Sequence, residues 1–114
     1  MENNAAKEMA NNFIDMLRDK FGEKVTDFVI YNSYDGERGT TFSIRFEAYK
    51  YFILIMNYDR GRFGCSISYG TEGILLESSQ KWYDTADFEN YFKDLKEQIE
   101  LRIPDKFLKA NGWI

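Results

Sequence analysis

Residues 41–58 read TFSIRFEAYKYFILIMNY, and this stretch decides the fold. Over Thr41–Ala48 the side chains alternate strictly between apolar and polar, with Phe42, Ile44 and Phe46 on the apolar face. A period of two is typical of an antiparallel strand that has one face on the core and the other in water. Tyr51–Tyr58 is apolar on both faces, which predicts the central strand of the sheet.

Three further strands are expected around this pair. Val25–Tyr34 precedes it and ends in the glycine-containing turn 35–39, and Phe63–Tyr69 follows the turn 59–62. A glycine turn at 70–73 then leads into a short fifth strand, Ile74–Ser78. Because each connection is a tight turn, the pattern predicts a five-stranded antiparallel meander.

Helical periodicity occurs at both ends of the chain. Residues 3–21 repeat apolar side chains every three or four positions, and Gly22 suits a left-handed C-cap. A second helix begins near Thr85, and Pro104 ends it and starts a short final helix. The apolar stripe of the second helix is expected at Phe88, Phe92, Leu95, Ile99 and Ile103. We therefore expect a single α+β domain, residues 1–114, with the N-terminal helix, the C-terminal helix and the short final helix packed on one sheet face.

The chemical inventory of the chain argues against catalysis. The 114 residues contain no histidine and one cysteine, Cys65, so the usual proton shuttle is missing and an intrachain disulfide is impossible. Cys65 lies mid-strand between Phe63 and Ile67, where a thiol is expected to be buried and inert. We predict a protein that is not an enzyme and that needs no cofactor and no metal.

The charge distribution points toward a protein partner. The net charge is −4 and the sequence pI is about 4.9, and residues 72–105 hold nine acidic against four basic side chains. Such a chain is poorly suited to nucleic acid or anionic lipid, because both are bound through lysine and arginine. With no signal peptide expected at the polar N-terminus and no apolar run near the length of a membrane span, we predict a cytoplasmic protein without membrane contact.

Two other kinds of site match parts of the sequence. Gly61–Gly64 followed by an aromatic strand faintly matches an RNA-recognition sheet, but the element order and the acidic charge disagree with it. Acid pairs at helical spacing, 84/87 and 97/100, have the residue types for acid–base work, and Asp35, Asp59 and Glu72 could hold a divalent ion if their loops converged. Acids three residues apart on a helix are more often a solvated face.

The remaining candidate is a protein-binding surface. Tyrosine, tryptophan and arginine commonly anchor interfaces, and an acidic field steers a basic partner. The predicted partner-binding residues are Asp59, Glu72, Trp82, Tyr83, Asp84 and Asp87. The alternative reading of Trp82 and Tyr83 is that their rings only seal the junction of helix and sheet.

In length, acidity and α+β character the whole chain resembles the small cytosolic immunity proteins of bacterial toxin–immunity systems, including those of contact-dependent growth inhibition. No residue motif carries this resemblance. It implies a monomer or weak homodimer that binds and neutralises one cognate toxin domain, a basic nuclease-type domain in our interpretation. The alternative is a non-catalytic adaptor or small-ligand module that uses the open sheet face, and a histidine-free small enzyme ranks third.

Overall fold

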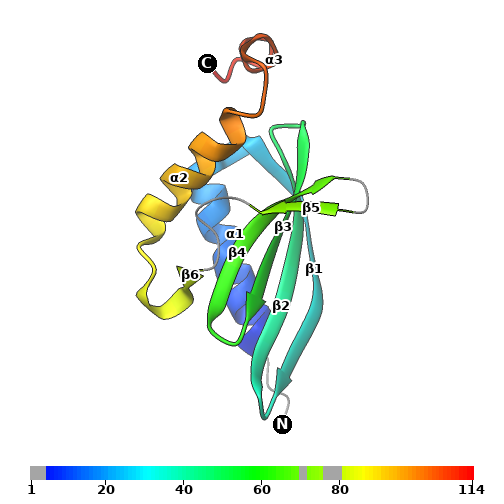
Figure 1. Cartoon of the computed structure of the whole chain (residues 1–114), viewed down its shortest axis with the longest axis vertical. Helices are drawn as coiled ribbons and strands as arrows, with labels where there is room; N and C mark the ends of the chain where they lie inside the picture. The colour runs from blue at the N-terminus through cyan, green and yellow to red at the C-terminus, as the bar shows by residue number, and fades with distance from the viewer. Residues whose placement is uncertain (1–4, 70–71, 76–80) are drawn as a thin grey trace.

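The computed structural model describes residues 5–69, 72–75 and 81–114, and its centre is an antiparallel sheet. Four long strands follow one another as neighbours (Figure 1): β1 (Val25–Gly36), β2 (Gly39–Ala48), β3 (Phe52–Asp59) and β4 (Arg62–Tyr69). Two short strands, β5 (Glu72–Leu75) and β6 (Lys81–Trp82), both pair with β4. β5 pairs with the last four residues of β4, and β6 pairs with its first two.

The predicted five-stranded meander is therefore wrong. Four strands build the body of the sheet, and the edge beyond β4 is divided between two short segments. β5 begins at Glu72, two residues before the expected start, and residues 76–78 of the expected strand lie outside the described part. A strand of two residues, such as β6, is too short to show any alternation. No pattern in the sequence therefore predicts that it pairs with β4.

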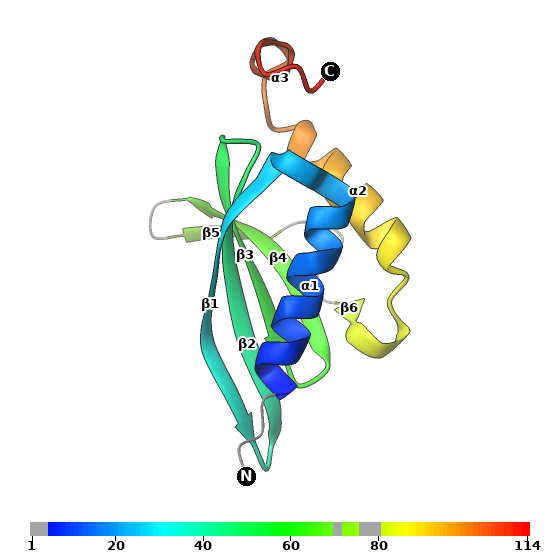
Figure 2. The same cartoon turned by 180° about the vertical axis from the view of Figure 1, so that it is seen from behind.

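The helices cover one face of the sheet. α1 (Ala5–Phe21) lies across that face with α2 (Phe88–Glu100) beside it (Figure 2). The inward side chains of β2 and β4 are those that the alternation predicted, and the inward side chains of β3, which is apolar on both faces in the sequence, join them. All are buried: Phe42, Ile44, Phe46, Ala48, Leu54, Met56, Tyr58, Phe63, Cys65 and Ile67. Phe63 is central to this core, since its ring lies 6.1 Å from Phe13 of α1 and 5.5 Å from Phe88 of α2. The α+β character is confirmed.

The final helix, α3 (Asp105–Ala110), differs from the prediction. It does not pack on the sheet face but lies past the end of the sheet, beside the turn between β2 and β3 (Figure 1). Two aromatic contacts hold it there: Phe107 lies 5.0 Å from Tyr51, and Trp113 lies 5.4 Å from Tyr49. Four residues, 101–104, separate α2 from α3, and with Pro104 as the N-cap of α3 the chain turns away from the sheet before α3 begins.

The other sheet face carries no described helix (Figure 1). Its cross-strand rows mix apolar and polar side chains, and Ser43 is only 7% exposed because Tyr31 and Asn57 flank it. The Ser43 hydroxyl donates a hydrogen bond of 2.6 Å to Asn57 Oδ1. Among the described helices, none is both long and apolar enough to cross a membrane.

Candidate functional site

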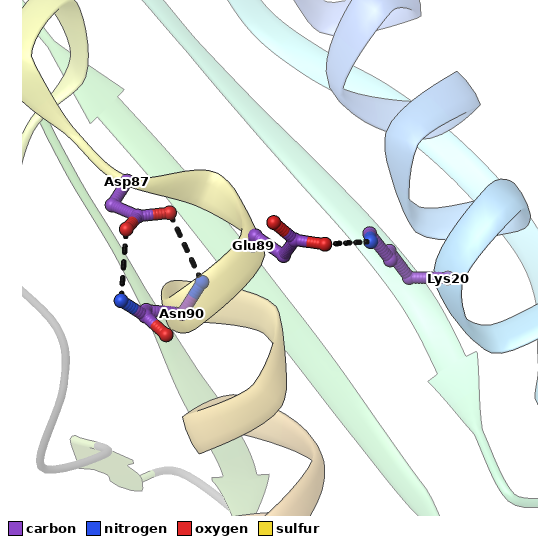
Figure 3. A network of polar contacts seen from close by, with 4 residues as sticks. All are labelled: Lys20, Asp87, Glu89 and Asn90. Atoms are coloured by element: carbon purple, nitrogen blue, oxygen red, sulfur yellow. Dashed lines mark hydrogen bonds and ion pairs between the residues drawn. The ribbon is translucent and has the colours of Figure 1, made fainter.

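The charged side chains of α2 divide between two flanks. On the flank facing α1, Lys20 of α1 forms an ion pair of 3.7 Å with Glu89 (Figure 3), and Lys96 lies 4.0 Å from Glu100. Glu100 also accepts a hydrogen bond from the Tyr49 hydroxyl at 2.5 Å. This flank therefore contains matched charges of both signs.

The opposite flank is uncompensated. Asp87, Asn90, Asp94, Glu97 and Leu101 follow one another at steps of three or four residues, so they form one exposed stripe along the helix. Lys93 and Lys96 fall on other faces of α2, and in the described part of the chain no ion pair involves an acid of this stripe. We call Asp84, Asp87, Asp94 and Glu97 together the acidic flank.

A hollow of about 340 Å³ opens beside the N-terminal half of this stripe. Asp87, Asn90 and Asp94 form one wall, and Trp82 and Tyr91 contribute rings. The hollow thus combines two carboxylates with an aromatic side chain that extends into water. Such a combination suits the docking of a cationic side chain.

Trp82 is the exposed aromatic residue of this region. Its side chain is 56% exposed, while the strand pairing of β6 with Arg62 and Phe63 fixes its backbone. The Arg62 guanidinium lies 5.2 Å from the centre of the Trp82 ring, a cation–π contact that orients the indole. Trp82 does not seal the junction of helix and sheet.

Tyr83, in contrast, does seal that junction. Its ring lies 5.4 Å from Tyr58, 5.6 Å from Phe63 and 5.1 Å from Phe88. Burial raises the pKa of the Tyr83 phenol, and the charges of Tyr58 and Asp84 add to the rise. Tyr83 is therefore a half-buried packing residue that supports its neighbour Trp82.

The structure brings Asp84 and Asp87 to the same end of the molecule as Trp82, each with a different local role. Asp84 is exposed, and its charge follows burial as the second cause that raises the pKa of Tyr58. Asp87 is the N-cap of α2: its carboxylate accepts hydrogen bonds from the Asn90 backbone N–H (3.2 Å) and side-chain amide (2.8 Å), as Figure 3 shows. Asp87 thus has a structural role in addition to any role in docking.

Asp59 and Glu72 differ from this group for separate reasons. Asp59 lies at the Trp82 end of β4, since Arg62 pairs with both residues, but its charge is compensated, whereas Glu72 lies at the far end. Asp59 is paired with Arg60 at 2.7 Å, and that hydrogen bond holds the pKa of the Asp59 carboxyl below its usual value. Glu72 pairs with Tyr69 at the end of β4 farthest from Trp82. Seven residue steps along β4 separate the two ends, roughly 23 Å. Neither residue contributes to the acidic flank.

Asp94 and Glu97 are the residues that the sequence analysis missed. Lys93 and Lys96 are their neighbours in sequence but not their ion-pair partners in the described structure, because Lys96 lies beside Glu100. The signal was present in the sequence, because the spacing of residues 87, 90, 94 and 97 places them on one helix face without a lysine.

The other candidate sites do not assemble in the described residues. Phe63 and Ile67 of β4 point into the core and leave no exposed pair of rings for RNA bases. Asp35 accepts hydrogen bonds from the Ala6 backbone N–H and the Thr40 hydroxyl, both at 3.0 Å. Within residues 5–69, 72–75 and 81–114, no three acidic or cysteine side chains group as metal ligands would.

Cys65 is fully buried. Burial raises the pKa of its thiol to about 12, and a hydrogen bond with Tyr91 offsets part of the rise. The thiol therefore stays protonated near neutral pH, which makes it a poor nucleophile.

Comparisons of the chain with protein-family models, with curated proteins and with solved structures find no match.

Proposed function

We propose that this protein is a non-enzymatic inhibitor of the immunity type, which binds a basic protein domain and blocks it stoichiometrically in the cytoplasm. The observation that carries the proposal is the acidic flank itself. Four carboxylates form a row that begins beside an exposed tryptophan and continues along α2, and no ion pair neutralises them within the described chain. A nuclease-type toxin domain is the partner class we favour, because its substrate site is built to receive a row of negative charges.

The two parts of the surface serve different steps of binding. Exposed carboxylates attract a cationic partner over about a Debye length, so they raise the association rate. A tryptophan buried on contact lowers the dissociation rate, because its large ring loses water and fills a complementary site. In this mechanism Asp84, Asp87, Asp94 and Glu97 steer the partner and Trp82 anchors it.

A capture experiment tests the proposal. The immobilised protein is exposed to an extract of its source, and the bound proteins are identified by mass spectrometry. The test variant is Asp84→Lys with Asp94→Lys, which leaves the N-cap Asp87 in place. The control is Asp15→Lys with Asp19→Lys, an equal charge change at exposed positions of α1. We expect one basic protein that the control captures and the test variant does not.

The captured protein must then be inhibited in a one-to-one ratio. The captured protein, once purified, should lose its activity on addition of one equivalent of the wild-type chain. Capture that does not differ between the two variants would contradict the proposal. So would turnover of a small molecule or polynucleotide by the protein alone.

A second candidate rests on the open sheet face. A hollow of about 300 Å³ lies at Gly64 on β4, with Asn57, Arg62 and Ser66 among its lining residues. Polar groups around a gap left by a missing side chain suit a small polar ligand, as the adaptor or ligand-module alternative requires. Such a ligand would shift the amide resonances of Asn57 and Ser66 and leave those of Asp94 unchanged.

A further inference from the structure

The junction of α2 and α3 contains a second hollow that is larger than the one beside Trp82. Its volume is about 420 Å³, and the chain turns around it between Leu101 and Asp105. Ile103 and Leu108 are buried beneath it. Leu101 and Ile114 stand at its sides with 79% and 58% of their surface exposed. Exposed aliphatic side chains next to a hollow are typical of a binding site.

The polar residues of this hollow are all acidic. Glu97, Glu100 and Asp105 complete its lining, and no basic residue of the described chain contributes to it. The nearest arginine in sequence, Arg102, is turned back onto α2, where it donates hydrogen bonds to the Gln98 carbonyl oxygen (2.8 Å) and Oε1 (3.0 Å). Lys96 lies beside Glu100, outside the hollow.

An aliphatic floor with carboxylates at its border fits one kind of side chain in particular. Lysine and arginine carry an apolar stem and a cationic head, so the stem can lie on Ile103 and Leu108 while the head reaches the carboxylates. A neighbouring leucine or isoleucine of the same segment would cover Leu101 and Ile114. Acidic peptides and anionic lipid surfaces are excluded by the sign of the charge.

We propose that the α2–α3 hollow binds a basic amphipathic segment of a partner protein, in which a lysine or arginine is adjacent to aliphatic residues. The inference rests on the proposed function and deepens it, because Glu97 and Leu101 continue the stripe that begins at Asp87. The two hollows lie along one helix, and residues 87 and 101 are roughly 21 Å apart along its axis. A partner that docks on the acidic flank therefore contacts both.

Peptide titration tests this inference without the natural partner. The probe is a synthetic peptide of alternating lysine and leucine pairs, and the comparison peptides replace leucine by glycine or lysine by glutamate. The readout is the amide spectrum of the 15N-labelled protein. We expect the lysine–leucine peptide to shift Leu101, Ile103, Leu108 and Ile114, and each comparison peptide to bind at least about tenfold more weakly.

Matched variants separate the hollow from general acidity. Glu97→Gln with Leu101→Ser should weaken the lysine–leucine peptide about tenfold or more, and neither substitution disturbs a buried side chain. Asp15→Asn with Glu89→Gln removes two charges from exposed positions elsewhere and should leave the affinity unchanged. Equal binding by both double variants would overturn the inference. Shifts confined to the open sheet face, or a dimer that Leu101→Ser dissolves, would overturn it too.

The outcome is separable from that of the proposed function. If the peptide fails at this hollow while Asp84→Lys with Asp94→Lys still abolishes partner capture, only the present inference is wrong. If the peptide binds here while the charge reversal leaves capture intact, only the proposed function is wrong.

Discussion

Phe92 shows how single aromatic residues hold the helices to the sheet. Its side chain is almost completely buried, and its ring lies 5.5 Å from Phe13, 6.3 Å from Phe21 and 6.0 Å from Phe88. Phe92→Ala would leave a cavity between both helices, so we expect the free energy of unfolding to fall by about 3–5 kcal/mol. Urea denaturation measures this, with exposed Lys93→Ala as a control expected within about 0.5 kcal/mol. A loss below about 1 kcal/mol for Phe92→Ala would place it outside the core.

The buried thiol of Cys65 makes the stability of the folded protein depend on pH. Burial raises the pKa of its thiol from 9.0 to about 12, so the native state keeps a proton that the unfolded chain releases. The contribution of this thiol to the free energy of unfolding is fully present below pH 9 and is lost as the pH rises toward 12. The phenols of buried Tyr58 and half-buried Tyr83 act in the same direction, since burial raises the pKa of each.

We therefore expect the free energy of unfolding to decrease steadily above pH 9, by up to about 1.4 kcal/mol per pH unit for each such group. Denaturant titrations from neutral to alkaline pH measure it. Cys65→Ala is the matched comparison, because it removes one titrating group and should make the decline less steep. A wild-type stability that stays constant through this range would show that the thiol is solvated.

At this scale the sequence predicted most of the core. The alternation in Thr41–Ala48 placed Phe42, Ile44 and Phe46 inward, and all three are buried. Helical spacing placed Phe92 and Leu95 inward with equal success. Local periodicity was sufficient there, because side-chain direction follows directly from the period of the element.

The turn between β2 and β3 has residues in the left-handed region that turns usually reserve for glycine or asparagine. Tyr49 and Lys50 both have positive φ, 59° and 54°, although neither is glycine or asparagine. Tyr49 is held there by its buried ring, its hydrogen bond to Glu100 and its backbone N–H bond to the Lys24 carbonyl. Exposed Lys50 lacks such burial, so its left-handed backbone costs about 1–2 kcal/mol.

Lys50→Gly should therefore stabilise the protein by about 0.5–1 kcal/mol, after the added entropy of the unfolded glycine is deducted. Thermal and urea unfolding measure the change. Lys93→Gly in the middle of α2 is the matched control, and it should destabilise by about 1 kcal/mol. If both substitutions changed the free energy of unfolding in the same direction, the left-handed conformation of Lys50 would be contradicted.

Elements that depend on distant pairing were the ones the sequence could not predict. β6 exists because Lys81 and Trp82 meet Phe63 and Arg62, almost twenty residues earlier in the chain. α3 leaves the sheet face because Phe107 and Trp113 find aromatic partners at the β2–β3 turn. In each case long-range contact, which no local period reports, decides the position of the element.

At the scale of the whole molecule, the fold sorts the acidic residues. Glu89 and Glu100 of α2 lie beside lysines, and Asp59 lies beside Arg60. Asp84, Asp87, Asp94 and Glu97 remain on one flank next to Trp82. The sequence predicted an acidic C-terminal third, but which carboxylates share a surface depends on helix phase and on the return of the chain to β4.

The association rate of the captured partner as a function of salt tests the acidic flank most directly. Steering by four exposed carboxylates predicts that this rate falls about tenfold or more as NaCl rises from about 0.05 to 0.5 M. Asp84→Lys with Asp94→Lys should bind slowly at every salt concentration and lose most of this dependence. An association rate that changes neither with the salt concentration nor with the charge reversal would contradict the account.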